Sequence, residues 1–243
     1  MAKSFTFKQF HIDAFGCGMP VSTDAILLGA WVNIDNVSSV LDIGCGTGVL
    51  ALMCAQRNPQ AAITGIEIEE NAYLAASQNC KNSIWSNRLT IAHISLQDYA
   101  NKHSSVDAII CNPPYFNDGQ QSAVSQRAMA RHTASLTHHS LLVHCDKLLK
   151  QNGTASFVLP KQEGDDFIDI IEKMRLSGIT LCITRVVEVK TTLKKPVSRL
   201  LIEVAKKPVD AISSYQKSQL LIHDQDKYSS DFIALTKDFY LKM

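Results

Sequence analysis

The 243-residue sequence lacks any long apolar run and any sign of export. No apolar stretch approaches the roughly 20 residues that a membrane-spanning helix needs. The opening residues Met1–Ser4 do not begin a signal peptide. We therefore expect a cytoplasmic protein that makes no use of a membrane.

Cysteine pairs and metal-ligand spacings are also missing. The seven cysteines are odd in number, no two of them form a Cys-x-x-Cys pair, and several lie in apolar segments. The eight histidines show no ligand spacing with these cysteines. We expect reduced, mostly buried thiols and no metal site.

The sequence has little net charge, since 24 Lys and Arg residues against 23 Asp and Glu residues give +1. The charge is unevenly distributed, however. Seven bases and two acids lie between Arg185 and Lys207, and five bases and one acid lie between Arg127 and Lys161. This basic second half is compatible with a folded RNA partner, or with lysines that solvate the surface of a hairpin.

Helix and strand candidates alternate along the middle of the sequence. The pattern predicts strands at 38–43, 62–68, 89–94, 106–111, 154–159, 180–190 and 198–206, and helices at 48–57, 70–81, 136–150 and 165–176. Such alternation predicts an α/β fold in which helices cover both faces of a mostly parallel sheet and ligands bind beyond the carboxyl ends of its strands. The last two strands are expected to form a hairpin.

The segments on either side of this core are expected to pack on it, so that the chain forms one domain over residues 1–243. A helix begins at Ser22 or Thr23, and a short strand and an amphipathic helix follow the core. The expected parts are an N-terminal extension and helix at 1–35, the core at 36–207, and the C-terminal strand and helix at 208–243.

The segment Asn112-Pro113-Pro114-Tyr115 directly follows the apolar strand at 106–111. The side-chain oxygen of Asn112 can accept a hydrogen bond, and the two prolines hold the neighbouring carbonyls rigidly. The ring of Tyr115 offers a face to a flat group. An amino nitrogen held by two acceptors directs its lone pair at an electrophile, so the segment indicates methylation of an exocyclic amine. An ordinary strand-to-loop turn is the alternative.

A glycine-rich turn joins the first predicted strand to the helix after it. Its glycines are Gly44, Gly46 and Gly48, spaced G-x-G-x-G and not G-x-G-x-x-G as in dinucleotide-binding folds. Glycines let the backbone approach a ligand closely, and the helix N-terminus supplies unpaired N–H groups. Glu67 ends the next strand, where an acid can accept both hydroxyls of a ribose. A surface acid at a strand end is the alternative.

In this order and spacing, the motifs resemble class I S-adenosylmethionine-dependent methyltransferases that act on amino groups. The resemblance covers about residues 20 to 205 and implies a Rossmann-like, seven-stranded, mostly parallel sheet with an antiparallel C-terminal hairpin. It implies S-adenosyl-L-methionine as the cofactor, held by the segment from Asp42 to Gly48, by Glu67 at the ribose and by Asp98 at the adenine. Asp42 could instead brace the glycine turn, and Asp98 could cap a short segment.

Further segments narrow the resemblance to the bacterial family that methylates N6 of adenosine 37 in a valine tRNA. These segments are residues 5–10, 22–31, 111–116, 130–132 and 221–229. The narrower resemblance spans nearly the full chain. It implies that the partner is the anticodon stem-loop of a tRNA, and the modest charge is compatible with a monomer.

The resemblance implies that Asn112 Oδ1 and the Pro113 carbonyl accept the two N6–H groups of the adenine, with Asn112 also beside the cofactor. Tyr115 would stack on the flipped-out base with help from Phe116. The amine nitrogen becomes acidic as it is alkylated, so no metal or strong general base is needed. Most of the rate would then come from positioning the two reactants.

Other candidate residues have a functional and a plain structural interpretation. Arg127 and Arg131 follow a long polar loop beside the proposed site and are expected either on RNA phosphate or at a solvated helix start. Lys194 and Lys195, in the hairpin turn, are expected to contact the RNA. Thr23 either reaches the methionine end of the cofactor or simply begins a helix.

Three other activities share the expected fold. Enzymes that methylate the glutamine amide of a release factor usually carry a helical N-terminal domain, and enzymes that methylate adenine in DNA usually carry a recognition domain. Enzymes that methylate guanine N2 in ribosomal RNA typically have Phe where this chain has Tyr115. A non-catalytic RNA- or cofactor-binding module is a fourth possibility, but it has no need of a rigid clamp for an amino group.

Overall fold

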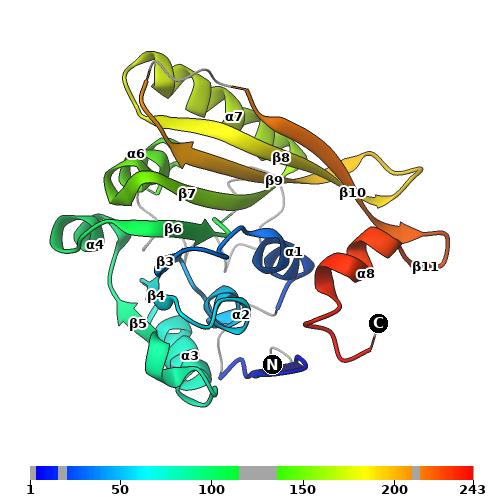
Figure 1. Cartoon of the computed structure of the whole chain (residues 1–243). Coiled ribbons are helices and arrows are strands. Elements are labelled where there is room, and N and C mark those ends of the chain that lie inside the picture. Colours follow the sequence, from blue (N-terminus) through cyan, green and yellow to red (C-terminus); the bar gives the residue numbers. More distant parts are fainter. Residues whose placement is uncertain (1–3, 16–20, 115–135, 210–213, 243) are drawn as a thin grey trace, which may run out of the picture.

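The structure, a computed structural model, describes residues 4–15, 21–114, 136–209 and 214–242. Its strands are β1 (Phe5–Thr6), β2 (His11–Ile12), β3 (Ser39–Ile43), β4 (Ala62–Glu67), β5 (Leu89–His93), β6 (Val106–Cys111), β7 (Leu149–Pro160), β8 (Leu181–Thr192), β9 (Val197–Lys206), β10 (Gln216–Asp224) and β11 (Lys227–Tyr228). All but β1 and β2 join one nine-stranded sheet in the order β11-β10-β8-β9-β7-β6-β3-β4-β5 (Figure 1). All seven strands expected for the core are in this sheet.

The strands β5, β4, β3, β6 and β7 run parallel to one another. Ile43, the last residue of β3, lies opposite Ile66 of β4 and Cys111 of β6. The carboxyl ends of these three strands therefore meet at one edge, which we call the carboxyl edge. The glycine turn, Glu67 and Asn112 all follow or end these strands, so the fold brings the predicted motifs together.

The sheet ends in an antiparallel part. Strand β9 pairs antiparallel with both β7 and β8, which confirms the predicted C-terminal hairpin. The sheet then continues, because β10 pairs parallel with β8 and β11 pairs antiparallel with β10. The short strand predicted after the core, β10, is thus an extension of the main sheet.

Helices cover both faces of the sheet (Figure 1). They are α1 (Thr23–Trp31), α2 (Val49–Arg57), α3 (Glu70–Lys81), α4 (Leu96–Lys102), α6 (His138–Leu148), α7 (Lys161–Leu176) and α8 (Ser230–Thr236), with a short 3-10 helix at Ser86–Arg88. Ile110 of β6 packs in one buried cluster with α1, α2 and α8, whereas Ile109 packs in another with α4, α6 and α7. Because successive side chains of a strand point to opposite faces, the two clusters lie on the two sides of the sheet.

The two ends of the chain lie beside each other on the α1 face. Phe7 and Phe10 stack with ring centroids 4.4 Å apart and are buried in the same cluster as Phe239. The backbone N–H of Lys8 donates to the carbonyl of Phe239 at 2.9 Å. Residues of both flanking segments are thus buried in the cluster on the α1 face.

Two local features differ from the sequence prediction. Helix α4 was not predicted, although Ser95 accepts a hydrogen bond from the backbone N–H of Asp98 at 3.1 Å and Ser-x-x-Asp is a known capping pattern. Strand β7 begins at Leu149, earlier than predicted, because α6 continues directly into it. Its first residues, Lys150-Gln151-Asn152-Gly153, are polar and lack the apolar pattern of a strand.

The six described cysteines are free and buried: Cys45, Cys54, Cys80, Cys111, Cys145 and Cys182. Burial raises the pKa of Cys54 and Cys80 to about 12, so these thiols stay protonated at neutral pH and are poor nucleophiles. Within the described ranges, no His, Cys, Asp and Glu side chains are grouped as a metal site would require. None of the described helices is both long and apolar enough to span a bilayer.

Candidate active site

The turn after β3 adopts a conformation that favours glycine. Gly44, Gly46 and Gly48 have φ angles of 66°, 55° and 84°, in the left-handed region that other residues rarely enter. The backbone N–H groups of Gly44 and Cys45 donate to the carbonyl of Ile66 at 2.9 and 3.0 Å. The turn is therefore fixed to the end of β4, and α2 begins directly after Gly48.

Glu67 ties the glycine turn to the end of β4 from the other side. Its Oε2 accepts the N–H of Gly46 at 2.9 Å, and its Oε1 accepts the N–H groups of Ile68 and Glu69 at 2.8 and 2.9 Å. The residue is only 8% exposed, so the alternative of a surface acid is wrong. A carboxylate offers about four acceptor positions, which leaves Glu67 able to accept a further donor such as a ribose hydroxyl.

Asp42 lies beneath the same turn and is fully buried. Its Oδ2 accepts the backbone N–H of Ala51 in the first turn of α2 at 3.0 Å, and no described residue donates to its Oδ1. Burial raises the pKa of Asp42 to about 8, and the nearby charge of Glu67 acts in the same direction. Asp42 thus joins β3 to α2, as the bracing role requires, and a contact of Asp42 with the cofactor stays a prediction.

Asn112 follows β6 at the same edge. Its Oδ1 is buried and accepts no hydrogen bond from any described residue. Buried polar atoms in native proteins nearly always have a partner, so such an acceptor at a ligand-binding edge indicates that a ligand supplies the donor. The next residue, Pro113, is buried and has no N–H of its own to offer.

The comparison with known families rests on this part of the chain. The profile described as "Methyltransferase small domain" matches residues 22–168, which contain the glycine turn, Glu67 and Asn112. The chain belongs to the methyltransferase small-domain family. Relatives from Aliivibrio fischeri (51% identical over 100% of both chains) and Vibrio campbellii (50% identical over 99% of this chain and 97% of the relative) are both named tRNA1(Val) (adenine(37)-N6)-methyltransferase. The family resemblance drawn from the sequence motifs is thus confirmed.

Solved structures of other methyltransferases share the fold of this chain. A predicted O-methyltransferase from Agrobacterium tumefaciens superposes with a TM-score of 0.69, covering 89% of this chain and 96% of that one at 15% identity. The N-methyltransferase NodS from Bradyrhizobium japonicum superposes with a TM-score of 0.52, covering 76% and 94% at 15% identity. At these identities the likeness shows the fold, and it confirms the predicted class I methyltransferase architecture.

The family and its fold imply S-adenosyl-L-methionine as the cofactor, and the carboxyl edge fits this group. Gly44 is exposed, and a Cβ added to it would meet no atom within 4 Å, so the backbone there is open to the close approach that a nucleotide-like ligand requires. Glu67 can accept hydroxyl donors, while Asn112 Oδ1 is an acceptor without a described donor. The site thus combines a nucleotide-binding turn with an acceptor for an amino group.

Asp98 has a structural role in the described chain. It lies in the first turn of α4, where its carboxylate accepts the hydroxyl of Ser95 at 2.7 Å. Its backbone N–H donates to the same hydroxyl oxygen, so the two residues cap the helix reciprocally. This arrangement fits the capping alternative. A contact between the exposed Asp98 and the cofactor adenine stays a prediction.

Thr23 and Asp24 begin α1, which Ser22 caps by accepting the N–H of Ala25 at 3.1 Å. Asp24 forms an ion pair with Arg199 of β9 at 2.8 Å, which joins the helix to the antiparallel part of the sheet. Thr23 is exposed and lines a cavity beside this ion pair. The plain helix start is thus present, and a contact with the cofactor stays a prediction.

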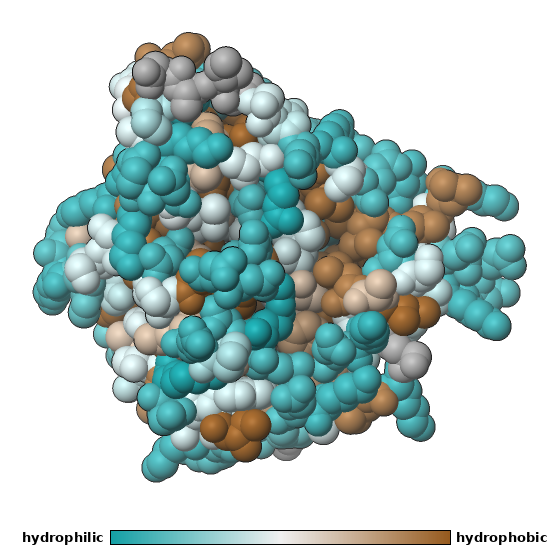
Figure 2. Space-filling view, in the orientation of Figure 1, coloured by the Kyte–Doolittle hydropathy of each residue, from teal (hydrophilic) through white to brown (hydrophobic). Residues whose placement is uncertain are grey.

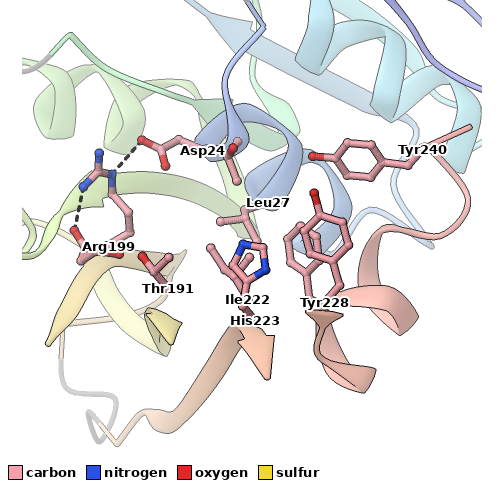
Figure 3. Close-up of a pocket in the computed structure, with 11 residues that line it drawn as sticks. Asp24, Leu27, Thr191, Arg199, Ile222, His223, Tyr228 and Tyr240 are labelled. Atoms are coloured by element: carbon pink, nitrogen blue, oxygen red, sulfur yellow. Dashed lines mark hydrogen bonds and ion pairs between the residues drawn. The ribbon is translucent and has the colours of Figure 1, made fainter. Parts of the chain in front are cut away.

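The cavity beside Thr23 was not found from the sequence. It has a volume of about 300 Å³ and lies between α1, the β8–β9 hairpin, β10 and α8 (Figure 3). Its walls include His223, Tyr228 and Tyr240 from the C-terminal segment. The run from His223 to Tyr240 contains several aromatic residues, but only the fold shows that they face α1.

Lys194 and Lys195 are exposed in the turn between β8 and β9. Strand β8 is parallel to β7, so this turn projects from the carboxyl edge, as Asn112 does. The structure therefore places both lysines on the predicted side of the sheet, and their contact with RNA stays a prediction.

Four predicted site residues lie outside the described part of the chain: Tyr115, Phe116, Arg127 and Arg131. The polar loop expected after the Asn-Pro-Pro-Tyr segment lies there too, up to residue 135. The described chain resumes before α6, where the side chain of Thr137 accepts the N–H of Ser140 at 3.1 Å. The roles of these four residues remain predictions from the sequence.

Proposed function

We propose that the protein transfers a methyl group from S-adenosyl-L-methionine to N6 of adenosine 37 in the anticodon loop of a valine tRNA. The observation that carries this proposal is the buried Oδ1 of Asn112, which has no described donor and lies beside the glycine turn. Relatives that match over the full chain at 51% and 50% identity bear the name of this activity, which supports the choice of nucleotide and tRNA.

The cofactor would be held by residues at the carboxyl edge. The backbone from Gly44 to Gly48 would lie against it, and the carboxylate of Glu67 would accept its ribose hydroxyls. Asp98 would face its adenine and Thr23 its methionine end. When bound, the cofactor supplies a methyl group that is reactive because the sulfur bearing it carries a positive charge.

The adenine amine would be held by Asn112 Oδ1 and the Pro113 carbonyl, each accepting one N6–H. With both hydrogens held, the nitrogen lone pair points at the methyl group, and this fixed geometry lowers the barrier. Tyr115 and Phe116 would stack on the extruded base, which costs little at an unpaired loop position. The methylated nitrogen is acidic and loses one proton to water, so Asn112 acts as an acceptor and not as a base.

The tRNA would be bound through its backbone by the basic second half of the chain. Arg127, Arg131, Lys194 and Lys195 would contact phosphates of the anticodon stem-loop. We further propose that the chain acts as a cytoplasmic monomer built as one domain over residues 1–243.

The proposed reaction is tested by offering the purified protein methyl-labelled cofactor together with separate pools of tRNA, ribosomal RNA, DNA and release factor. We expect label in the tRNA pool, recovered as N6-methyladenosine after digestion to nucleosides. Label in the release factor would instead assign the protein to glutamine-amide methylation. Label in ribosomal RNA or DNA would assign it to those substrates, and no label in any pool would contradict the enzyme assignment.

Replacing both Lys194 and Lys195 by alanine is expected to lower the affinity for tRNA and to make that affinity less dependent on salt concentration. Two lost phosphate contacts should reduce the slope of log Kd against log salt by about 1 to 2. The matched control replaces Lys102 and Lys173, two exposed lysines in the last turns of α4 and α7, by alanine. Both variants are measured by fluorescence anisotropy with labelled tRNA at several salt concentrations. Equal slopes in the two variants would contradict the assignment of the hairpin lysines.

A further inference from the structure

The cavity of about 300 Å³ beside α1 has mixed walls and a polar ion pair at one end. Residues from three parts of the chain form it: Thr23 and Asp24 of α1, Thr191 and Arg199 of the hairpin, and Tyr228 and Tyr240 near the C-terminus. A space of this size lies at the lower end of small-ligand pockets and is large enough for one nucleotide. Figure 2, in the orientation of Figure 1, shows hydrophobic surface gathered where the hairpin and the α8 region meet, bordered by hydrophilic surface.

Three aromatic rings form a continuous stack at one wall of this cavity. The rings of His223 and Tyr228 lie with centroids 4.9 Å apart at 21°, and those of Tyr228 and Phe232 lie 5.0 Å apart at 29°. His223 is at the end of the stack, since Tyr228 is its only ring contact among the described residues. A flat ring entering the cavity can therefore continue the stack on His223.

The cavity also offers hydroxyl groups beside the ring stack. Figure 3 shows the hydroxyls of Tyr228 and Tyr240 pointing toward the same space. Neither hydroxyl makes a hydrogen bond to a described residue, and Tyr228 is 41% exposed. Burial raises the pKa of Tyr240 to about 12, so its hydroxyl remains a neutral donor and acceptor at physiological pH.

The position of the cavity links it to the proposed reaction. Arg199, one of its walls, lies opposite Pro160, the last residue of β7, and β7 is the direct neighbour of β6. Thr191 of β8 also lines the cavity. Strand β8 lies three positions from β6 in the sheet, which is roughly 14 Å at the usual strand spacing. If the methylated base is held at Asn112, a few unstacked nucleotides of the same strand are long enough to reach from it to the cavity.

Most residues that line the cavity lie outside the segment that the methyltransferase profile matches. The matched region ends at residue 168, whereas the ring stack and Tyr240 come from residues 223–240. The C-terminal segment thus adds a ring stack and hydroxyls to a domain that already holds the proposed chemistry. Lys194 and Lys195, exposed in the turn of the hairpin whose Thr191 and Arg199 line the cavity, favour a ligand with phosphates beside it.

We propose that this cavity binds one unstacked nucleotide of the substrate RNA, a near neighbour of the methylated adenosine. Its base stacks on His223, and the hydroxyls of Tyr228 and Tyr240 border the space that the rest of the nucleotide occupies. The inference rests on the proposed function, because the RNA that enters the cavity is the tRNA substrate of that function. It assigns to the C-terminal segment the recognition of a second base in the loop.

The test compares the affinity of three variants of the full chain for a fluorescein-labelled anticodon stem-loop of valine tRNA. His223→Ala should raise Kd roughly 5- to 150-fold, the usual loss when a base loses its stacking partner. His223→Phe keeps a ring and should bind within about threefold of the unchanged protein. His103→Ala is the matched control, because His103 likewise stacks on a tyrosine, Tyr99, at 4.1 Å, but precedes β6 at the opposite edge of the sheet.

Binding and methyl transfer are measured separately, so that the two proposals can fail separately. Equal affinity of the His223→Ala and His103→Ala variants would overturn the inference alone. Binding that depends on His223, with no methyl transfer to tRNA, would overturn the proposed function and support the RNA-binding cavity. No binding of the stem-loop by the unchanged protein would overturn both, and displacement of the stem-loop by an equal concentration of adenosine monophosphate would reassign the cavity to a free nucleotide.

Discussion

Replacing Asn112 by alanine is expected to lower the turnover number for tRNA methylation by roughly 100- to 1,000-fold, as when one preorganised hydrogen-bonding group is lost from an active site. The Oδ1 atom of Asn112 is buried at the end of β6 without a described donor, so it is placed to hold the amine. The KM for the cofactor should change far less, because Glu67 and the glycine turn hold that ligand. Steady-state kinetics with labelled cofactor measures both parameters.

The matched variant is Asn112→Asp, which keeps an acceptor oxygen at the same reach. It should retain more turnover than the alanine variant, because a carboxylate oxygen takes the place of Oδ1, and the amine then keeps two acceptors and not the Pro113 carbonyl alone. The thermal unfolding midpoints of both variants show whether β6 and its neighbours remain folded. An alanine variant whose turnover stays within about threefold of the unchanged protein would remove Asn112 from the reaction.

The elements that place Asn112 could be predicted because their signals are local. Val40-Leu41 and Ile109-Ile110 are apolar runs that become buried central strands, and the glycines of the turn occupy positions with positive φ. Register then follows from parallel pairing, which aligns Ile43 with Cys111 and so brings the motifs to one edge. Sequence periodicity and a few conformationally demanding residues were therefore sufficient for this half of the site.

The cavity beside α1 could not be predicted in the same way. It exists because β10 pairs in parallel with β8 and because Tyr240 folds back toward α1, and both contacts join residues far apart in the sequence. The ion pair between Asp24 and Arg199 likewise joins residues 175 positions apart. No short sequence pattern specifies these contacts, because they depend on where the C-terminal segment packs against the sheet and α1.

Asp42 and Glu67 show how two acids at one site differ once their surroundings are known. Glu67 accepts three backbone N–H groups. Asp42 is fully buried, accepts one N–H from Ala51, and has its pKa raised to about 8. The sequence could not assign the bracing role to Asp42, because the difference lies in burial and in the number of donors.

The raised pKa of Asp42 predicts how the stability of the protein depends on pH. Unfolding returns the Asp42 carboxyl to its ordinary pKa of 3.8, so between about 4 and 8 the folded state binds a proton that the unfolded state lacks. The contribution of Asp42 to stability is therefore present below pH 4 and is lost as the pH rises through 8. Asp42→Asn removes this titration, so its stability relative to the unchanged protein should increase with pH by at most about 1.4 kcal/mol per pH unit.

Urea unfolding of both proteins at pH 5, 6, 7 and 8 measures this difference. Because other titrating groups are shared, their effects cancel when the two free energies of unfolding are subtracted at each pH. Asp226→Asn, at an exposed acid in the turn between β10 and β11, is the matched control for the substitution itself. If Asp42→Asn gave a constant difference, Asp42 would be ionised throughout, and the brace between β3 and α2 would be a charged one. If the difference grows with pH as expected, a neutral carboxyl holds the first turn of α2 beneath the glycine turn at physiological pH.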